Sequence, residues 1–258
     1  MPHRHTAEAA SARIYDFALG GKDNYAADRD AAVQAYRELP AARLLPRENR
    51  KFMRRAVRAM LEAGVRQFLD LGCGLPGKGN VHEVALAADP GCRTVYVDHD
   101  PVAVVHYQAL LGSVPGATAV CADVREPAAI LADPEVTALL DLSRPVGVLL
   151  IATLSLVGDD AVAARTARAF RDALPPGGHL AVCDFTDEAL TPRDLEVNRE
   201  LMRACGVRVD FRSREVLASY FDGLEPLPPG LAPAADWRPD RPHPPATGWL
   251  LAGVARKP

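Results

Sequence analysis

Five short apolar segments that alternate with helical segments constrain the fold of this chain more than any other feature. The apolar segments all follow Arg66 and read RQFLDLG, RTVYVD, ATAVCAD, PVGVLLIA and GHLAVCDF. Each is apolar almost throughout, which is typical of parallel strands covered on both faces. Helices are expected between them, near residues 79–88, 101–112, 127–140 and 160–174. The alternation predicts βαβ units with right-handed crossovers in a mostly parallel sheet with helices on both faces.

Three amphipathic helices are predicted before the first strand. They run from Ser11 to Leu19, from Asp23-Asn24 to the residue before Pro40, and from Pro46 to Gly64. One face of the third helix carries Arg47, Arg50, Lys51, Arg54, Arg55 and Arg58. We interpret this as a solvated basic face, since no aromatic residues are interspersed for stacking on nucleic-acid bases. We expect residues 1–64 to form a helical cover and residues 65–258 an α/β domain, in one compact unit.

The last part of the chain predicts two more helices and a final strand. The helices are expected at Arg193 to Cys205 and at Ser213 to Phe221, and the strand within GWLLAGVARK. Eight of the 22 prolines lie between Pro226 and Pro245. Because proline interrupts both helices and central strands, this segment is predicted to be a long ordered loop or a flap.

Charge and cysteine content limit the classes of partner and compartment. The 258 residues include 30 basic and 33 acidic residues, for a net charge of −3. This balance does not favour binding to nucleic acid or to an anionic membrane, so we expect a small-molecule partner and allow for a homo-oligomer. The five cysteines include no Cys-x-x-Cys motif, which argues against a disulfide framework or a metal site. With a polar N-terminus and no long apolar stretch, the sequence predicts a cytoplasmic protein.

A glycine-rich loop follows the first apolar segment. In FLDLGCGLPGKGN, Gly72, Gly74 and Gly77 satisfy the G-x-G-x-x-G pattern of nucleotide-binding loops. Two residues before the first glycine is Asp70, where a carboxylate would repel the phosphates of a dinucleotide. S-adenosylmethionine (SAM) carries an ammonium and a sulfonium and no phosphate, so the loop fits SAM better than NAD. The alternative is that Asp70 only accepts hydrogen bonds from the loop backbone.

Two further acids end the second and third apolar segments. Asp98 is placed to accept both ribose hydroxyls, a role that SAM and NAD proteins share. Asp123 is placed to accept the adenine amine, while the Val124 amide reaches a ring nitrogen. Because the carboxyl ends of parallel strands meet at one edge of the sheet, the three acids predict an adenosine site there.

The chain resembles the class I SAM-dependent methyltransferases, and more closely an actinobacterial S-adenosyl methyltransferase family formerly catalogued as a domain of unknown function. The resemblance extends over SARIYDFALGGKDNYAADRDAA, FLDLGCGLPGKGNVHEVA, VYVDHDPV, PVGVLLIATLSLVGDD, ALPPGGHLAV, and RSREVLASYFDGLEP through DWRPD. It implies a Rossmann-like sheet of seven strands, with an antiparallel last strand from Trp249 to Ala255 and the N-terminal helices over the cofactor pocket. It implies SAM contacts at Asp70, Gly72, Cys73, Gly74, Asn80, Asp98, His99, Asp123, Val124 and Thr153.

Two positions depart from the family pattern. A threonine commonly follows the loop proline where this chain has Gly77, and the fourth strand commonly ends Leu-His where this chain has Leu154-Ser155. If that histidine touches substrate in relatives, this protein handles another acceptor or positions it differently.

A further group of residues is predicted to act on the methyl acceptor. Tyr15, Asp16 and His82 are the predicted catalytic residues, with Asp23 as a further candidate general base. Lys22, Asn24, Tyr25 and Ser155 are predicted to bind substrate. Simple capping, packing or turn formation would explain the same residues, although a Gly-Gly hinge between two helices also suits a lid.

The resemblance implies transfer of a methyl group to a small molecule, expected to be a specialised metabolite. A non-catalytic SAM-binding regulator is the alternative from another class. An NAD-dependent oxidoreductase is disfavoured by Asp70 and by the lack of a Tyr-x-x-x-Lys motif.

Overall fold

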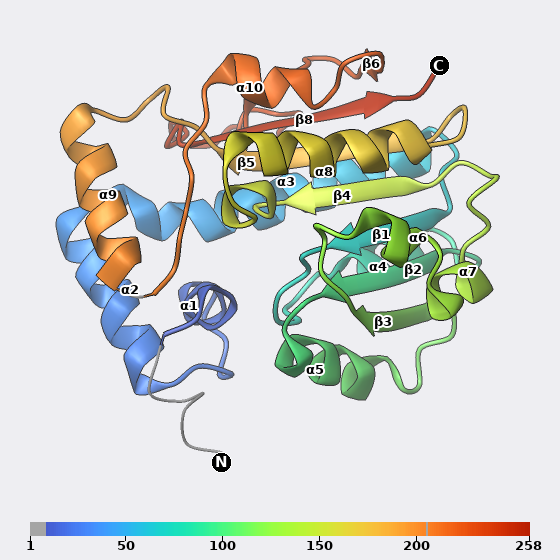
Figure 1. Cartoon of the computed structure of the whole chain (residues 1–258), viewed down its shortest axis with the longest axis horizontal. Helices are drawn as coiled ribbons and strands as arrows, with labels where there is room; N and C mark the ends of the chain where they lie inside the picture. The colour runs from blue at the N-terminus through green and yellow to red at the C-terminus, as the bar shows by residue number, and fades with distance from the viewer. Residues whose placement is uncertain (1–8, 205) are drawn as a thin grey trace.

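The sheet at the centre of the molecule contains the five strands that the apolar segments predict (Figure 1). The computed structural model describes residues 9–204 and 206–258. The long strands are β1 (Gln67–Leu71), β2 (Arg93–Asp98), β3 (Ala117–Cys121), β4 (Gly147–Ile151), β5 (His179–Phe185) and β8 (Leu250–Arg256). They lie in the order β3-β2-β1-β4-β5-β8, and only β8 is antiparallel to its neighbour β5.

Two short strands complete the sheet on the outer side of β8. These are β6 (Glu225–Pro226) and β7 (Ala232–Pro233), and both pair with β8. The described residues therefore contain an eight-stranded sheet. The predicted mostly parallel sheet with an antiparallel last strand is confirmed.

Each face of the sheet is covered by its own layer of helices. On one face, apolar residues of α3 (Leu45–Glu62), α4 (Val81–Ala88) and α5 (Pro101–Leu111) pack with Phe68 and Leu149. On the other, α6 (Pro127–Leu131), α7 (Pro134–Leu139), α8 (Asp160–Ala173) and α10 (Arg214–Ser219) pack around Leu69, Val148 and Leu150. Successive strand residues thus enter opposite cores, which explains why the strand sequences are continuously apolar.

The region from 127 to 140 forms two helices, where the sequence predicted one. The first helix ends at Leu131, and Asp133 caps the second, because its side chain accepts hydrogen bonds from the amides of Glu135 and Val136. Pro134 follows in the first turn of the second helix, where a backbone N–H would have no hydrogen-bond partner within the helix.

The N-terminal segment begins with α1 (Ser11–Ala18) and α2 (Ala26–Glu38), followed by a 3₁₀ turn (Pro40–Leu44). Asp28 is completely buried and holds the start of the segment together. Its carboxylate accepts hydrogen bonds from Ala10 N at 2.9 Å, Arg13 Nε at 2.9 Å and Tyr25 N at 2.8 Å. These contacts fix the position of α1 relative to α2.

The basic residues of α3 connect distant parts of the chain, so the expectation of a uniformly solvated face is wrong. Arg55 is buried and donates hydrogen bonds to the carbonyls of Trp237 and Ala234 in the proline-rich segment. Trp237 is itself buried, with its ring perpendicular to that of Phe52 at a centroid distance of 5.3 Å. The proline-rich segment is therefore an ordered cover of α3.

A further helix, α9 (Pro192–Ala204), contacts α2. Cys205, the predicted end of this helix, and residues 1–8 of the polar N-terminus lie outside the described residues. No helix in the described ranges is both long enough and apolar enough to cross a membrane.

Candidate active site

A groove runs along the carboxyl edge of the sheet, beside α1. Its volume is about 640 Å³, and six predicted cofactor residues line it: Gly72, Asp98, His99, Asp123, Val124 and Thr153. Ser11, Ala12 and Arg13 contribute the opposite wall. The strand ends and the first helix, far apart in the sequence, together form this groove.

Asp98 occupies the end of β2 and is held in its ionised form. Its Oδ2 accepts from Gly74 N at 2.8 Å and its Oδ1 from Asp100 N at 2.9 Å, while His99 Nδ1 lies 3.4 Å from Oδ1. Burial acts to raise the pKa of Asp98, but the hydrogen bonds from His99, Asp100 and Gly74 outweigh it and lower the pKa. The carboxylate therefore remains available as a charged acceptor for the two ribose hydroxyls.

Asp123 forms the next position along the groove and is paired with Arg125. Its Oδ1 accepts from both the backbone amide and Nε of Arg125, each at 2.9 Å. The hydrogen bonds from Arg125 lower the pKa of Asp123. A carboxylate has enough lone pairs to accept an adenine amine beside this pair.

The glycine loop passes close to the end of β4. Gly72 and Gly74 adopt φ values of +70° and +63°, a conformation that favours glycine. A Cβ on Gly72 would lie 2.6 Å from Cγ2 of Thr153, whose hydroxyl donates to Leu71 O at 2.8 Å. Ala152, which precedes Thr153, also has a positive φ of 58°. The backbone at this point is tightly constrained, as expected where a ligand must approach the loop closely.

Asp70 and Arg50 lie together beyond Gly72. Burial raises the pKa of Asp70 to about 7, while the Arg50 charge acts to lower it and the Asp98 charge to raise it. No described residue donates a hydrogen bond to the Asp70 carboxylate within the described chain, so the alternative that it only caps the loop is wrong. A buried acid with no donor fits an incoming ammonium group.

Arg50 is a functional candidate that the sequence did not single out. It comes from α3, and its Nη2 donates to Asn80 Oδ1 at 2.9 Å and to Lys78 O at 3.2 Å. Its Nε is buried and donates to no described residue. A Cβ at Gly77 would lie 3.3 Å from Nη2, so the glycine at this unusual position leaves room for the guanidinium. Arg50 is placed to hold the carboxylate of an amino acid whose ammonium meets Asp70.

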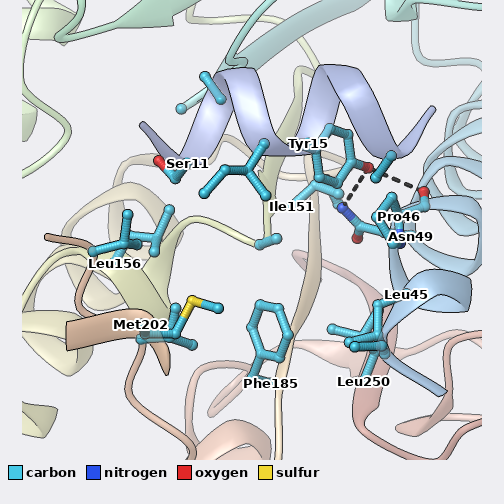
Figure 2. Close-up of a pocket in the computed structure, with 18 of the residues that line it drawn as sticks. Ser11, Tyr15, Leu45, Pro46, Asn49, Ile151, Leu156, Phe185, Met202 and Leu250 are labelled. Atoms are coloured by element: carbon cyan, nitrogen blue, oxygen red, sulfur yellow. Dashed lines mark hydrogen bonds between the residues drawn. The ribbon is translucent and has the colours of Figure 1, made fainter. Parts of the chain in front are cut away.

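An apolar cavity adjoins this end of the groove (Figure 2). We call it the α1 cavity; its volume is about 230 Å³, and it is lined chiefly by Ile14, Ala18, Ala35, Leu45, Met53, Ile151, Leu156, Phe185, Met202, Phe211 and Leu250. Ser11, Ala12, Gly72 and Leu156 line both the cavity and the groove. A molecule in the α1 cavity would therefore lie next to the ligand of the groove.

Tyr15 and Asn49 provide a polar patch on the wall of the α1 cavity, as Figure 2 shows. The Tyr15 hydroxyl donates to Pro46 O at 3.2 Å and accepts from Asn49 Nδ2 at 3.0 Å. Burial raises the pKa of Tyr15, although Arg50 and the hydrogen bond from Asn49 act to lower it. Tyr15 is thus a neutral, hydrogen-bonded phenol that lines the cavity.

The other predicted catalytic residues line neither the groove nor the α1 cavity. His82 is buried, and its Nδ1 lies 2.7 Å from the hydroxyl of Tyr96. Asp16 shapes the loop between α1 and α2, because its carboxylate accepts from Asp23 N at 2.9 Å and Asn24 Nδ2 at 2.8 Å. A Cβ on Gly21 would collide with this carboxylate, and Gly20 has a φ of +80°, which favours glycine.

The predicted substrate residues are also placed outside the cavity. Lys22 and Tyr25 are exposed, and Tyr25 lies against the guanidinium of Arg13, 5.4 Å from the ring centroid. Asp23 Oδ2 is 3.8 Å from His106 Nδ1 on α5. Ser155 is buried, and its amide donates to Asp184 Oδ2 at 2.8 Å. Of the remaining predicted cofactor residues, Cys73 lines the α1 cavity, whereas Asn80 holds Arg50 and the amide of Gly77.

The groove, together with Asp70 and Arg50 in the adjoining wall of the α1 cavity, matches the charge distribution of SAM. Asp98 and Asp123 suit the ribose and adenine, and Asp70 and Arg50 suit the ammonium and carboxylate of the methionine part. Gly72, which lines both spaces, lies between these two ends. The sulfonium and its methyl group would therefore face the α1 cavity.

Comparison with known proteins gives the same assignment. The family model described as S-adenosyl methyltransferase matches residues 2–258. A candidate methyltransferase from Thermobifida fusca YX is 38% identical, with 99% of this chain and 97% of that chain covered and a TM-score of 0.92. A DUF574 family protein from Streptomyces avermitilis MA-4680 is also 38% identical, with 98% and 99% covered and a TM-score of 0.93.

More distant structures share the fold. The N-methyltransferase NodS from Bradyrhizobium japonicum WM9, solved with S-adenosylhomocysteine (SAH), is 17% identical, with 88% of this chain and 98% of that chain covered and a TM-score of 0.51. Comparison with curated protein sequences gives no match. The family model and the two close structures, each spanning nearly the whole chain, show that this protein belongs to the S-adenosyl methyltransferase family and is a SAM-dependent methyltransferase.

Proposed function

We propose that the protein methylates a small, largely apolar molecule, a specialised metabolite, that binds in the α1 cavity. The observation that carries this proposal is the apolar lining of the cavity together with its shared wall with the cofactor groove at Gly72 and Leu156. A cavity of about 230 Å³ suits one small molecule. Cys73, Cys92, Cys121 and Cys183 are free thiols, which supports a reducing, cytoplasmic location.

The chain contributes mainly orientation to this reaction. SAM supplies a methyl group on a sulfonium, and the carbon passes to the acceptor as the C–S bonding electrons return to sulfur. Asp98 and Arg50 would fix the two ends of the cofactor, and the apolar wall would hold the acceptor and exclude water. Holding two reactants in line is worth effective molarities on the order of 10⁵ M or more.

Transfer of label tests the proposal. The protein is incubated with methyl-labelled SAM and a low-molecular-mass extract of the source organism, and the products are separated by chromatography. We expect label in one apolar compound. Label confined to macromolecules added to the same reaction would contradict a small-molecule acceptor.

The affinity for SAH is expected to rise with pH through about 7. The pKa of Asp70 is raised to about 7 by burial, so the carboxyl is half protonated at that pH, and it must ionise to bind the ligand's ammonium. The favourable contribution of Asp70 to SAH binding is therefore present above pH 7 and is lost below it. The affinity for SAH falls by at most about tenfold per pH unit below pH 7. Calorimetric titrations between pH 6 and 8.5 measure it.

Methylthioadenosine provides the matched ligand, because it shares the adenosine of SAH but lacks the ammonium. The pKa of His99 is raised by its hydrogen bond to Asp98, and the titration of His99 would change the affinity for both ligands alike. A pH dependence for SAH only, absent in Asp70→Asn, would identify Asp70. The same dependence for both ligands would assign it to another group.

Arg50→Leu is expected to weaken SAH binding about tenfold and to leave methylthioadenosine binding nearly unchanged. The variant removes one charge-assisted hydrogen-bond partner of the ligand carboxylate, worth about 1.5 kcal/mol or more. Titration of both ligands into both proteins measures the difference directly. Arg47→Leu, an exposed position on the same helix, is the control. Equal losses for the two ligands would show that Arg50 only supports the glycine loop.

A further inference from the structure

One acceptor oxygen in the wall of the α1 cavity has no donor. Asn49 is 4% exposed and lines the cavity. Its Nδ2 donates to the Tyr15 hydroxyl, but its Oδ1 accepts from no group of the described chain. Leaving a buried acceptor without a hydrogen bond costs about 1–3 kcal/mol, so such a group calls for an explanation.

The orientation of this amide is fixed by hydrogen-bond accounting. Tyr15 has a single hydroxyl proton, and the carbonyl of Pro46, 3.2 Å away, can only accept it. With its proton donated to Pro46 O, the hydroxyl acts as acceptor toward Asn49, and the group that faces it is the NH₂. In Figure 2 the amide nitrogen is joined to Tyr15, and the oxygen is on the side of the group away from Tyr15. A flipped amide would make Asn49 Oδ1 and Pro46 O compete for the single proton of the hydroxyl.

The Tyr15–Asn49 pair lies near Arg50 and Asp70, which line the same cavity. The charges of both Arg50 and Asp70 act on the Tyr15 hydroxyl, and Arg50 follows Asn49 in α3. The rest of the wall is mostly apolar but also includes Ser11, Tyr36, Arg50, Asp70 and Asn198. When Asp70 is paired with the ammonium of SAM, a donor on an apolar molecule in the cavity would therefore find in Asn49 Oδ1 an acceptor that no described residue satisfies.

We propose that Asn49 Oδ1 accepts a hydrogen bond from an N–H or O–H group of the methyl acceptor and so selects donor-bearing substrates over their apolar isosteres. This inference rests on the proposed function, because it requires the acceptor to occupy the α1 cavity. Tyr15 is then a positioning residue, which keeps the oxygen of Asn49 free for the substrate. A site built around a substrate donor discriminates strongly against analogues that lack it.

Matched aromatic probes test this inference without knowledge of the natural substrate. 2-Naphthol carries one O–H donor, and 2-fluoronaphthalene has nearly the same shape without it. Both are titrated into the SAH-bound protein and followed by calorimetry. The wild type is expected to bind 2-naphthol about tenfold more tightly, the contribution of one neutral hydrogen bond of up to 1.5 kcal/mol.

Two variants separate the role of Asn49 from general packing. Asn49→Leu keeps the approximate size and should bind both probes equally, with unchanged SAH affinity as the check on folding. Tyr15→Phe retains the ring but frees the amide to rotate, so the preference for 2-naphthol should fall and not vanish. The wild-type preference alone remains informative if either variant fails to fold.

The outcomes distinguish this inference from the proposed function. Equal binding of the two probes to the wild type overturns the role of Asn49 and leaves the apolar cavity intact. A preference for 2-naphthol that persists in Asn49→Leu also overturns it. Binding of neither probe to the SAH-bound wild type contradicts the apolar acceptor site itself, and with it the inference.

Discussion

Asp98→Ala is expected to weaken SAH binding by about 10- to 150-fold, or about 1.5–3 kcal/mol. The substitution removes a charged acceptor for the ribose hydroxyls and also the hydrogen bonds that Asp98 accepts from Gly74 N and Asp100 N. Because the hydrogen bonds from His99, Asp100 and Gly74 lower the pKa of Asp98 despite burial, the wild-type group is ionised at neutral pH. Calorimetric titration with SAH measures the effect.

Two controls separate ribose binding from loop support. Asp98→Asn keeps one oxygen for Gly74 N, so it should retain more of the loop geometry while losing the charge. Asp141→Ala removes an exposed acid near Gln67, at the opposite edge of the sheet, and should leave SAH affinity unchanged. An Asp98→Ala affinity within twofold of wild type would show that the ribose lies elsewhere.

The strand-end acids could be predicted because their position follows from a simple rule. Asp70 belongs to β1, Asp98 ends β2, and Asp123 follows β3, and the sheet order places these strands side by side. Continuous apolar segments identified the strands, and parallel pairing brings their carboxyl ends to one edge. The common position of the three acids at one edge of the sheet could therefore be predicted from local patterns.

Arg50 could not be predicted because its neighbours are distant in sequence. On α3 it is one of six basic residues with similar spacing, and nothing local distinguishes it from Arg47 or Lys51. Its role comes from contacts with Lys78 and Asn80, 28 and 30 residues away. Gly77, next to the guanidinium of Arg50, was the one sequence feature that pointed to Arg50. It can be interpreted only when the structure shows that α3 lies against the glycine loop.

For the loop between α1 and α2, the sequence predicted a binding role where the structure shows turn formation. Its residues were predicted to contact substrate, but the structure uses Asn24 and Asp16 to close the turn and leaves Lys22 exposed. Asn and Asp are favoured both in turns and in binding sites, so residue type alone could not separate the two roles. The cavity residues Ile14 and Ala18 occupy apolar positions of an amphipathic helix. The sequence alone therefore does not distinguish cavity lining from core packing at these positions.

Filling the α1 cavity tests the central claim, that the acceptor binds under α1 beside a separately bound cofactor. Ala18→Phe adds a ring to the cavity lining, whereas Ala109→Phe makes the same change at an exposed position of α5. The initial rate of label transfer from SAM to the small-molecule product is measured for both, together with SAH affinity. The account predicts at least about a tenfold loss of transfer in Ala18→Phe, because the ring takes the acceptor's space, with SAH affinity within about twofold of wild type and no change in Ala109→Phe. Undiminished transfer by Ala18→Phe would contradict it.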